Sequence, residues 1–414
     1  MTIAATLSRR IGDAVRRVQR VFSEPADAAT LYDCYVRNAQ GEYPAIDYVP
    51  IAQEAPPTGE VRLVAYYLPQ FHPIPENDEW WGKGFTEWRN VTRSFPLFDG
   101  HYQPRLPGEM AYYDLRVVDV MRRQVELAKL YGISAFCFHF YWFQGKRLLE
   151  LPVENYLATT DLDLPFSLCW ANEPWSRRWS GREQDVLIEQ RHSADDDIAI
   201  IRYLERYFRD PRYLKIGGKP VFTVYRPSLF PDMADTVARW REEIARLGWP
   251  GIYLIATNAF DFADYERYGF DALSEFPPHG VQAPNIEKSL KMTPLRRGGR
   301  VRSYADTVEA EKVKAPGLGV VHPGVMPSWD NSPRRLTSSV IYHGATPALF
   351  REWLEHAFAR AAANPLEERL VFVNAWNEWG EGAYLEPDRR FGYGFLKACA
   401  DCRALAVLQR DDHA

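Results

Sequence analysis

Eight short apolar segments recur between residues 61 and 376, and amphipathic helical patterns separate most of them. The segments show no alternation of apolar and polar residues, so they are predicted as strands that are buried on both faces. The predicted strands span residues 61–68, 133–140, 166–170, 221–225, 252–257, 272–276, 319–326 and 370–376. The predicted helices span about 117–130, 195–209, 233–247, 347–363 and 392–407. Strands that are joined through helices form parallel sheets, so the sequence predicts an α/β fold.

The parallel sheet is predicted to close into a (β/α)8 barrel, the TIM barrel, rather than to stay open. A doubly wound sheet carries a glycine-rich phosphate turn after its first strand, and no such turn follows residue 68. Polar and aromatic residues follow the end of each predicted strand, where barrel enzymes assemble their active sites. We therefore expect residues 61–414 to form one barrel domain with long strand-to-helix loops. Residues 1–60 are expected to form an N-terminal helix and a linker.

Residues 6–22 place apolar side chains on one helical face and arginines on the opposite face. Such a basic amphipathic helix can lie on an anionic membrane surface, dock on a partner or cover the barrel, and the sequence leaves these alternatives open. No signal peptide is predicted, because no continuous apolar core follows Met1, and no segment approaches membrane-spanning length. The chain is therefore expected to be cytoplasmic, with a peripheral membrane contact through residues 6–22 as one alternative.

Composition bears on the partners and cofactors of the chain. The formal net charge is −5 and the basic residues are spread along the sequence, so no nucleic-acid partner is expected. The five cysteines are sparse and odd in number, and Cys137 and Cys169 fall within predicted strands, so we expect reduced, buried thiols. No ligand spacing typical of a zinc or calcium site is found, so neither a metal nor another cofactor is expected. The sequence does not determine the oligomeric state.

Tryptophan occurs 13 times, and ten of these residues lie at or just beyond the ends of predicted strands. Flat aromatic rings bury much apolar area with few torsions to freeze, which suits them to stacking on sugar rings. Core packing is the alternative for any one of them, but their clustering favours a carbohydrate-binding cleft. The ten are Trp80, Trp81, Trp88, Trp142, Trp170, Trp175, Trp179, Trp329, Trp376 and Trp379.

Two glutamates, Glu378 and Glu381, follow the last predicted strand directly. An ionised carboxylate that is removed from water costs several kcal/mol unless it is paired or neutralised, and a second carboxylate nearby raises the pKa of one member. A protonated acid beside an ionised carboxylate is the pair that cleavage of a glycosidic bond requires. The alternative is that both residues are solvated, or are ion-pair partners of arginines such as Arg389 and Arg390.

The segment 377–382, Asn-Glu-Trp-Gly-Glu-Gly, followed by Glu-Pro at 386–387, resembles the signature of the family 99 glycoside hydrolases, the endo-α-mannosidases and endomannanases. Residues 60–395 resemble more closely the WbsX-type proteins of bacterial polysaccharide gene clusters, through segments 66–73 and 80–88. The resemblance implies a barrel that acts as a retaining glycosidase on a mannose-configured or related bacterial surface glycan. It implies no cofactor.

The resemblance also implies roles for the two glutamates. Glu381 would protonate the departing glycosidic oxygen and later activate water. Glu378 would deprotonate the 2-hydroxyl of the sugar, which then attacks the anomeric carbon to form a 1,2-anhydro sugar. The alternative, in which Glu378 is a covalent nucleophile, remains open. Glu173, in an Asn-Glu-Pro segment at the end of a predicted strand, is a second candidate acid.

Residues at or near the predicted strand ends are the candidate walls of a sugar-binding site. Two of them, Tyr66 and Tyr67, match the position of a tyrosine pair in the family 99 enzymes, and one of the two is open to being a core residue. The basic segment 284–316 is predicted to be a solvated loop, with a lid over an anionic glycan as the alternative. The candidate substrate-binding residues are Tyr66, Tyr67, His72, Glu87, Trp88, His139, Tyr141, Asn172, Glu173, Trp175, Glu275, Trp329, Asp330, Trp376 and Asn377.

Two other functional classes compete with the hydrolase. The first is a glycosyltransferase or transglycosylase of O-antigen or capsular polysaccharide synthesis, the label under which WbsX-type proteins are grouped. Nucleotide-sugar transferases often hold a metal at an Asp-x-Asp strand end, but Asp161 and Asp163 precede a predicted strand instead. The second class is a non-catalytic carbohydrate-binding protein, which would need the aromatic cleft but not the glutamate pair.

Overall fold

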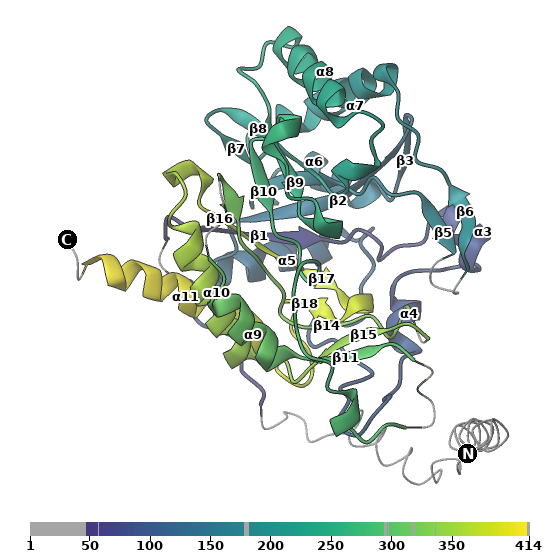
Figure 1. Ribbon diagram of the computed structural model, residues 1–414, viewed down its shortest axis with the longest axis vertical. Coiled ribbons are helices and arrows are strands. Elements are labelled where there is room, and N and C mark those ends of the chain that lie inside the picture. The colour runs from purple at the N-terminus through teal and green to yellow at the C-terminus, as the bar shows by residue number, and fades with distance from the viewer. Residues whose placement is uncertain are drawn as a thin grey trace, which may run out of the picture.

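The computed structural model describes residues 47–411, apart from residues 57, 178–181, 294, 295, 297, 316, 318 and 336. The predicted amphipathic helix 6–22 and Cys34 lie outside the described residues. Parallel strands with helices between them form a nearly closed barrel, which confirms the predicted (β/α)8 architecture (Figure 1).

Nine parallel strands of the described chain make up the barrel wall, in the spatial order β12-β10-β9-β8-β4-β2-β1-β16-β13. Each predicted strand corresponds to one of them, or to two in the case of the seventh. Their bounds are β1 (Arg62–Tyr67), β2 (Ala135–Phe143), β4 (Phe166–Trp170), β8 (Lys219–Val224), β9 (Tyr253–Thr257), β10 (Ala272–Ser274), β12 (Val321–His322), β13 (Gly324–Val325) and β16 (Leu370–Val373).

The seventh predicted strand is split at Pro323, and the split brings the two edges of the sheet together. Its first half, β12, pairs with β10, and its second half, β13, pairs with β16. The Pro323 carbonyl oxygen accepts a hydrogen bond from the backbone N–H of Phe372 (2.9 Å). A Cβ atom on Gly324 would lie 2.3 Å from the backbone oxygen of Glu275, so only glycine allows the chain to pass at this point.

Helices cover the outside of the barrel, and the predicted helices are found within a few residues of their expected bounds. Side chains of Ser193, Asp232 and Thr346 accept hydrogen bonds from backbone N–H groups in the first turns of α7, α8 and α10, which explains where these helices begin. In Figure 1, α7 and α8 pack together at the top, and α10 packs on α11 at the lower left. The helices are α5 (Val118–Leu130), α6 (Leu151–Ala158), α7 (Ala194–Phe208), α8 (Met233–Arg246), α9 (Tyr304–Lys312), α10 (Pro347–Ala361) and α11 (Gly394–Asp411).

The described residues of the basic segment 284–316 are folded, which corrects the expected solvated loop. They contain strand β11 (Arg300–Ser303) and helix α9. β11 pairs in parallel with β15 (Val340–His343), and β15 pairs in antiparallel fashion with β14 (Trp329–Asp330). This three-stranded sheet lies near β17 (Asn377–Glu378) and β18 (Ala383–Tyr384), below the barrel strands in the view of Figure 1. Val301 and Val308 are buried and hold the segment in place, which the many basic residues of 284–316 did not indicate.

Further short elements decorate the loops. They are α3 (Pro75–Trp81) and α4 (Trp88–Thr92) after β1, β3 (Lys146–Leu148) against β2, the hairpin β5 (Trp175–Arg177) and β6 (Arg182–Ile188), and β7 (Lys215–Ile216) against β8. None of the described helices is long and apolar enough to cross a membrane.

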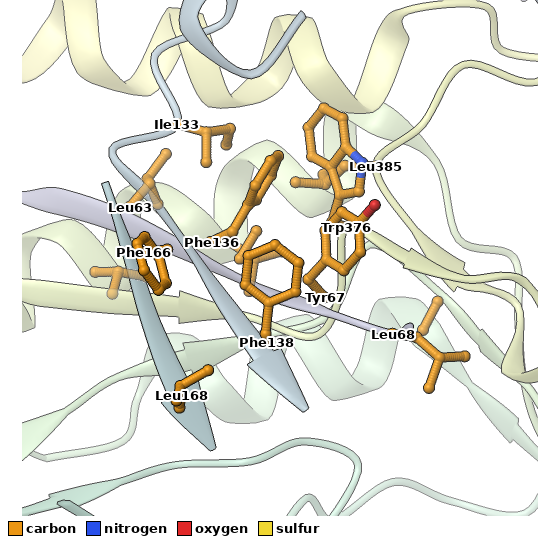
Figure 2. Close-up of a cluster of buried hydrophobic side chains, with 14 of the residues drawn as sticks. Leu63, Tyr67, Leu68, Ile133, Phe136, Phe138, Phe166, Leu168, Trp376 and Leu385 are labelled. Carbon is orange, nitrogen blue, oxygen red and sulfur yellow. The ribbon is translucent and has the colours of Figure 1, made fainter. Parts of the chain in front are cut away.

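Side chains alternate between two apolar layers along the barrel strands. The outer layer lies between strands and helices, and Figure 2 shows Tyr67 of β1, Phe136 and Phe138 of β2, and Trp376 gathered on this side. The inner layer fills the barrel and includes Tyr66 and the buried, free thiols of Cys137 and Cys169. The expectation of buried, free thiols is confirmed for these two and for Cys399 and Cys402.

Candidate active site

A cavity of about 680 Å³ opens at the carboxyl ends of the barrel strands. Each of the eight strand positions contributes at least one residue to its wall, which is the placement expected for the active site of a barrel enzyme. In strand order these residues include Leu68, His139, Tyr141, Glu173, Tyr225, Phe260, Phe276, Trp329, Asn374, Glu378 and Glu381. The long loops add Gln70, Trp81, Trp175, His279, Arg302, Asn331, Arg334, Arg335 and Tyr342.

The glutamate pair is carried by a short turn that is fixed to the end of the first strand. β17 and β18 form a hairpin, and a 3-10 turn over residues Trp379–Glu381 connects them. Asn377 side-chain atoms pair with the backbone of Leu68, with Oδ1 accepting from its N–H (2.7 Å) and Nδ2 donating to its C=O (3.0 Å). Trp379 is buried and stacks on Tyr384 with ring centroids 3.7 Å apart. The turn therefore has little freedom to move.

Two glycines in the turn are required by close approaches. A Cβ on Gly380 would lie 1.9 Å from Oε1 of Glu87, so any side chain there would displace that carboxylate. Gly382 has φ of 61°, in the left-handed region, and ends the 3-10 turn. A Cβ on Gly382 would also lie 3.1 Å from the guanidinium of Arg105. The Asn-Glu-Trp-Gly-Glu-Gly sequence thus encodes one compact turn that presents both glutamates to the cavity.

The guanidinium of Arg334 lies among three carboxylates. Its Nε donates to Oε1 of Glu87 (2.7 Å), its Nη2 donates to Oε2 of Glu378 (2.9 Å), and its Nη1 lies 2.9 Å from Oε1 of Glu381. Arg334, Glu87 and Glu378 are buried, and Glu381 is half-buried at the cavity wall. The ion pairing that the sequence left as an alternative therefore occurs, and its partner is Arg334.

Burial and charge imbalance keep protons on this cluster. Burial raises the pKa of Glu378 to about 8; Arg334 opposes that rise, while Glu381 and Glu87 add to it. Burial also raises the pKa of Glu381, against the opposing effect of Arg334. Near neutral pH, Glu378 is therefore mainly protonated, and the pKa of its neighbour Glu381 is shifted in the same direction. A proton held between two carboxylates is what acid–base cleavage of a glycoside needs. Burial lowers the pKa of the nearby His139 to about 4, so its imidazole is neutral.

A further carboxylate, Glu386, lies beneath the turn and outside the cavity. It accepts hydrogen bonds from the indole N–H groups of Trp376 (3.1 Å) and Trp379 (2.6 Å), from Nε2 of Gln124 (2.6 Å) and from the Tyr113 hydroxyl (2.9 Å). Burial raises the pKa of Glu386 to about 7, although the four donors favour its ionised form. Glu386 therefore anchors the turn from below through Trp379.

Seven residues predicted for the site line the cavity: His139, Tyr141, Glu173, Trp175, Trp329, Glu378 and Glu381. Glu173 forms an ion pair with Arg226 (2.6 Å), so its charge has an opposite partner at the cavity wall. Glu87, Asn172 and Asn377 lie directly behind the wall. Asn172, like Asn377, pairs its side chain with backbone groups, here those of Arg226 (2.7 and 2.8 Å).

Four aromatic or histidine predictions are wrong, because the side chains lie in the outer layer or in the loop core. Tyr67 points away from the barrel axis and donates to Oε1 of Gln124 (2.6 Å), whereas its neighbour Tyr66 points inward and stacks on His139. Trp88 is buried with its indole donating to the Tyr113 carbonyl (2.8 Å). His72 and Trp376 are also buried and are not part of the cavity wall. Tyr66 itself lies in the inner layer, below the wall.

Two acidic predictions are also wrong. Glu275 lies two residues after Leu273, so its side chain points to the same, outer side of the barrel. There its carboxylate is bound by Arg360 (2.7 and 3.0 Å) and Lys314 (2.9 Å). Asp330 lies on the face of the three-stranded sheet opposite to Trp329 and accepts from His101 and Gln103 (both 2.7 Å). Both acids stabilise the fold instead of facing the main cavity.

Sequence reasoning missed Arg334, Tyr342, Gln70 and His279, and it named Arg302 only as part of the basic segment 284–316. A signal existed for Arg334, because Ser-Pro-Arg-Arg at 332–335 follows the Trp-Asp-Asn segment that was assigned to the end of the seventh strand. The other residues come from loops whose folding was not predicted. Within the described part of the chain, no group of three or more His, Cys, Asp or Glu side chains is arranged to hold a metal ion.

The fold and the position of the cavity define a (β/α)8-barrel protein with its site at the strand ends. Residues 63–399 match the model of the family described as Glycosyltransferase WbsX, and the chain belongs to this family. A solved family 99 endo-α-mannosidase from Bacteroides thetaiotaomicron has a similar fold, with a TM-score of 0.53 at 14% identity, over 86% of this chain and 99% of that chain. A structure described as a glycoside hydrolase-like protein gives 0.53 at 16% identity, over 87% and 99%.

Two curated relatives are the WxcX proteins from two strains of Xanthomonas campestris pv. campestris. The chain is 49% identical to one over 362 residues, which is 87% of this chain and 52% of the relative. It is 50% identical to the other over 344 residues, which is 83% of this chain and 50% of the relative. The chain therefore spans about half the length of the curated relatives that it matches.

Proposed function

We propose that this chain is a retaining glycoside hydrolase that acts on an oligo- or polysaccharide, with Glu378 and Glu381 as its catalytic residues. The observation that carries the proposal is the turn that holds both glutamates on the wall of an aromatic cavity, where they share one guanidinium and are protonated in part near neutral pH. The family 99 likeness supports a mannose-configured or related bacterial glycan as the substrate.

In the proposed reaction, Glu381 donates a proton to the departing glycosidic oxygen, since it is the more exposed of the two carboxylates (23% against 8% of the side chain). Glu378 works in its ionised form, which it takes when the proton of the pair lies on Glu381. It then acts either as the base that removes the proton of the 2-hydroxyl or as the nucleophile that attacks the anomeric carbon. Both routes give two displacements and retain the anomeric configuration. Arg334 bonds to both carboxylates and stabilises the form in which one of them is ionised.

Transfer of the sugar to another hydroxyl is the second candidate activity, and the family description favours it. A retaining site forms an activated sugar that either water or an acceptor hydroxyl can intercept, so the same two glutamates serve both outcomes. Product analysis with and without an added acceptor saccharide distinguishes them. A protein that only binds carbohydrate would not need three carboxylates around the single guanidinium of Arg334.

The test compares wild type, Glu378→Gln and Glu381→Gln on two substrates: a mannose-configured disaccharide fluoride and the same disaccharide in O-glycosidic linkage. Fluoride needs little protonation to depart, so Glu381→Gln should lose about a thousandfold in kcat on the O-glycoside and much less on the fluoride. Glu378→Gln should lose activity on both substrates. The first product anomer, followed by proton NMR, should have the configuration of the substrate.

A cavity carboxylate with a balanced charge provides the comparison. Glu173→Gln should raise KM and lower kcat by less than about tenfold, because Glu173 is expected to contact the sugar without transferring a proton. Wild-type turnover in the Glu378→Gln, Glu381→Gln double variant would refute the assignment. An inverted first product would exclude the retaining mechanism.

A further inference from the structure

The three-stranded sheet β11-β15-β14 presents a row of three side chains to the cavity. Arg302 of β11 is the register partner of Tyr342 of β15, and Tyr342 is the register partner of Trp329 of β14. Register partners lie side by side on one face of a sheet, and all three residues line the cavity. A guanidinium, a phenol ring and an indole ring therefore form one continuous strip of the wall.

The opposite face of the same sheet is packed into a small apolar core. Val301 and Ile341 point to that side and pack with Leu97 and Phe98. Because side chains alternate along a strand, burial of Val301 and Ile341 fixes the direction in which Arg302 and Tyr342 point. The strip is thus held in place by the fold.

Arg302 differs from Arg334, the cation that is paired with both glutamates. Arg334 is surrounded by Glu87, Glu378 and Glu381. Among the described residues, no Asp or Glu forms an ion pair with Arg302. Its guanidinium contacts the carbonyls of Val281 and Ala283 (both 3.5 Å) and the Tyr342 ring, 5.9 Å from Cζ to the centroid.

These contacts hold one end of the Arg302 guanidinium, and no carboxylate in the described part of the chain balances its charge. A cation in a partly enclosed, aromatic-lined site loses hydration without regaining a carboxylate, and a bound anion would restore the balance. The planar fork of an arginine binds a carboxylate or a phosphate through two parallel hydrogen bonds. The adjoining rings of Tyr342 and Trp329 offer apolar faces for a sugar ring.

We infer that the strip Arg302-Tyr342-Trp329 is a subsite for an acidic sugar, one that bears a carboxylate or a phosphate group, within the glycan that the cavity binds. The inference rests on the proposed function only in so far as a saccharide occupies this cavity. It makes Arg302 a specificity-determining residue, which selects an anionic glycan over a neutral one. Glu378 and Glu381 are not required for this selection.

The test is a calorimetric titration of the full chain with trisaccharides of mannuronic, galacturonic and glucuronic acid, with their methyl esters, and with mannose 6-phosphate against mannose. An ester removes the charge and keeps the sugar, so each acid–ester pair isolates the anion. At least one acidic ligand should bind wild type about tenfold or more tightly than its neutral counterpart, as expected for a charged hydrogen-bonded pair. A preference for uronates identifies the carboxylate, and one confined to mannose 6-phosphate identifies the phosphate.

Variants then assign the preference to Arg302. Arg302→Met keeps the apolar stem and should bring the acidic ligand to the affinity of the neutral one, whereas Arg302→Lys should keep part of the preference. Lys288→Gln is the matched control, because it removes one positive charge from the same segment at an exposed position outside the cavity wall. Its preference should equal that of wild type.

The inference is overturned if no acidic ligand binds, if acidic and neutral members bind alike, or if the preference survives in Arg302→Met. The readout is binding, so it separates from the proposed function. The Glu378→Gln, Glu381→Gln double variant should keep the acidic preference whether or not hydrolysis occurs. Conversely, hydrolysis of neutral mannosides without any acidic preference would refute only the subsite.

Discussion

Two buried clusters of charged side chains lie beyond neighbouring strands of the barrel, and they differ in their ratio of acidic to basic residues. The outer cluster contains Glu275 and Glu311 with two cations, Arg360 and Lys314. The proposed catalytic cluster contains Glu87, Glu378 and Glu381 around Arg334, with Arg335 acting on Glu381 from a greater distance. The first has equal numbers of acids and bases, and the second has an excess of acids.

The difference appears in the pKa values. Burial acts to raise the pKa of Glu275, but Arg360 and Lys314 outweigh it and hold that pKa below its usual value. Burial raises the pKa of Glu378 to about 8, because Arg334 is shared with two other carboxylates. In the outer cluster the two cations keep Glu275 ionised, although burial raises the pKa of Glu311, whereas in the acid-rich cluster the pKa values of both Glu378 and Glu381 are raised. For Glu275 and Glu378, both buried, the ratio of neighbouring charges separates the structural acid from the proposed catalytic one.

Removal of the central arginine should give the largest contrast in stability. Arg360→Met leaves Glu275 buried with less compensation, and we expect a loss of about 3 to 5 kcal/mol in the free energy of unfolding. Arg334→Met should cost less at pH 5 than at pH 8, because its carboxylates can take up protons and so escape the unpaired state. Urea unfolding at the two pH values measures both effects. Equal, pH-independent losses in the two variants would contradict the distinction.

The pH dependence of stability should differ in sign for Glu378 and Glu275. The folded-state pKa of Glu378 is raised to about 8 from 4.5, so its contribution to stability is present below pH 4.5 and is lost as the pH rises towards 8. Glu378→Gln should therefore be more stable relative to wild type at pH 8 than at pH 5, by about 3 to 4 kcal/mol.

Glu275 provides the opposite case. Its folded-state pKa lies below 4.5, so its contribution is present above pH 4.5 and is lost as the pH falls through the folded-state value. The destabilisation of Glu275→Gln should be largest at pH 7 and should shrink towards pH 4. Urea unfolding of both variants across this range measures how the change in the free energy of unfolding depends on pH. The same dependence in both variants would rule out the proposed charge balance.

Glu386 offers a third arrangement, with four neutral donors and no ion pair among the described residues. In Glu386→Gln, one carboxylate oxygen becomes an NH2 group that cannot accept, so two of the donors lose their partner. We expect a loss of about 1 to 2 kcal/mol in stability. Because Trp379 anchors the turn that carries Glu378 and Glu381, the proposed catalytic residues, kcat should fall more than KM changes. Glu309→Gln, at an exposed site on α9, is the control for removal of a charge.

The strand pattern was predictable because burial on both faces leaves a continuous apolar run in the sequence. The helices were predictable where caps such as Ser193 and Asp232 precede an amphipathic pattern. α9 and the sheet around β11 were not, because the basic residues of 284–316 masked the few apolar anchors. The split of the seventh strand at Pro323 was also missed, since an interrupted strand and a continuous one show the same apolar composition.

The sequence by itself determined the eight-stranded barrel and the turn that carries Glu378 and Glu381. Continuous apolar runs, glycines and the spacing of two acids are local properties of the chain. Only the tertiary structure decided which strand-end residues reach the cavity. Tyr66 and Tyr67 are adjacent yet face opposite layers, and Glu275 faces outward with Leu273. It also decided that Arg334, 44 residues from Glu378, joins the pair. The physical reason is that the facing of a side chain and its counter-charge depend on register and on loops that are distant along the chain.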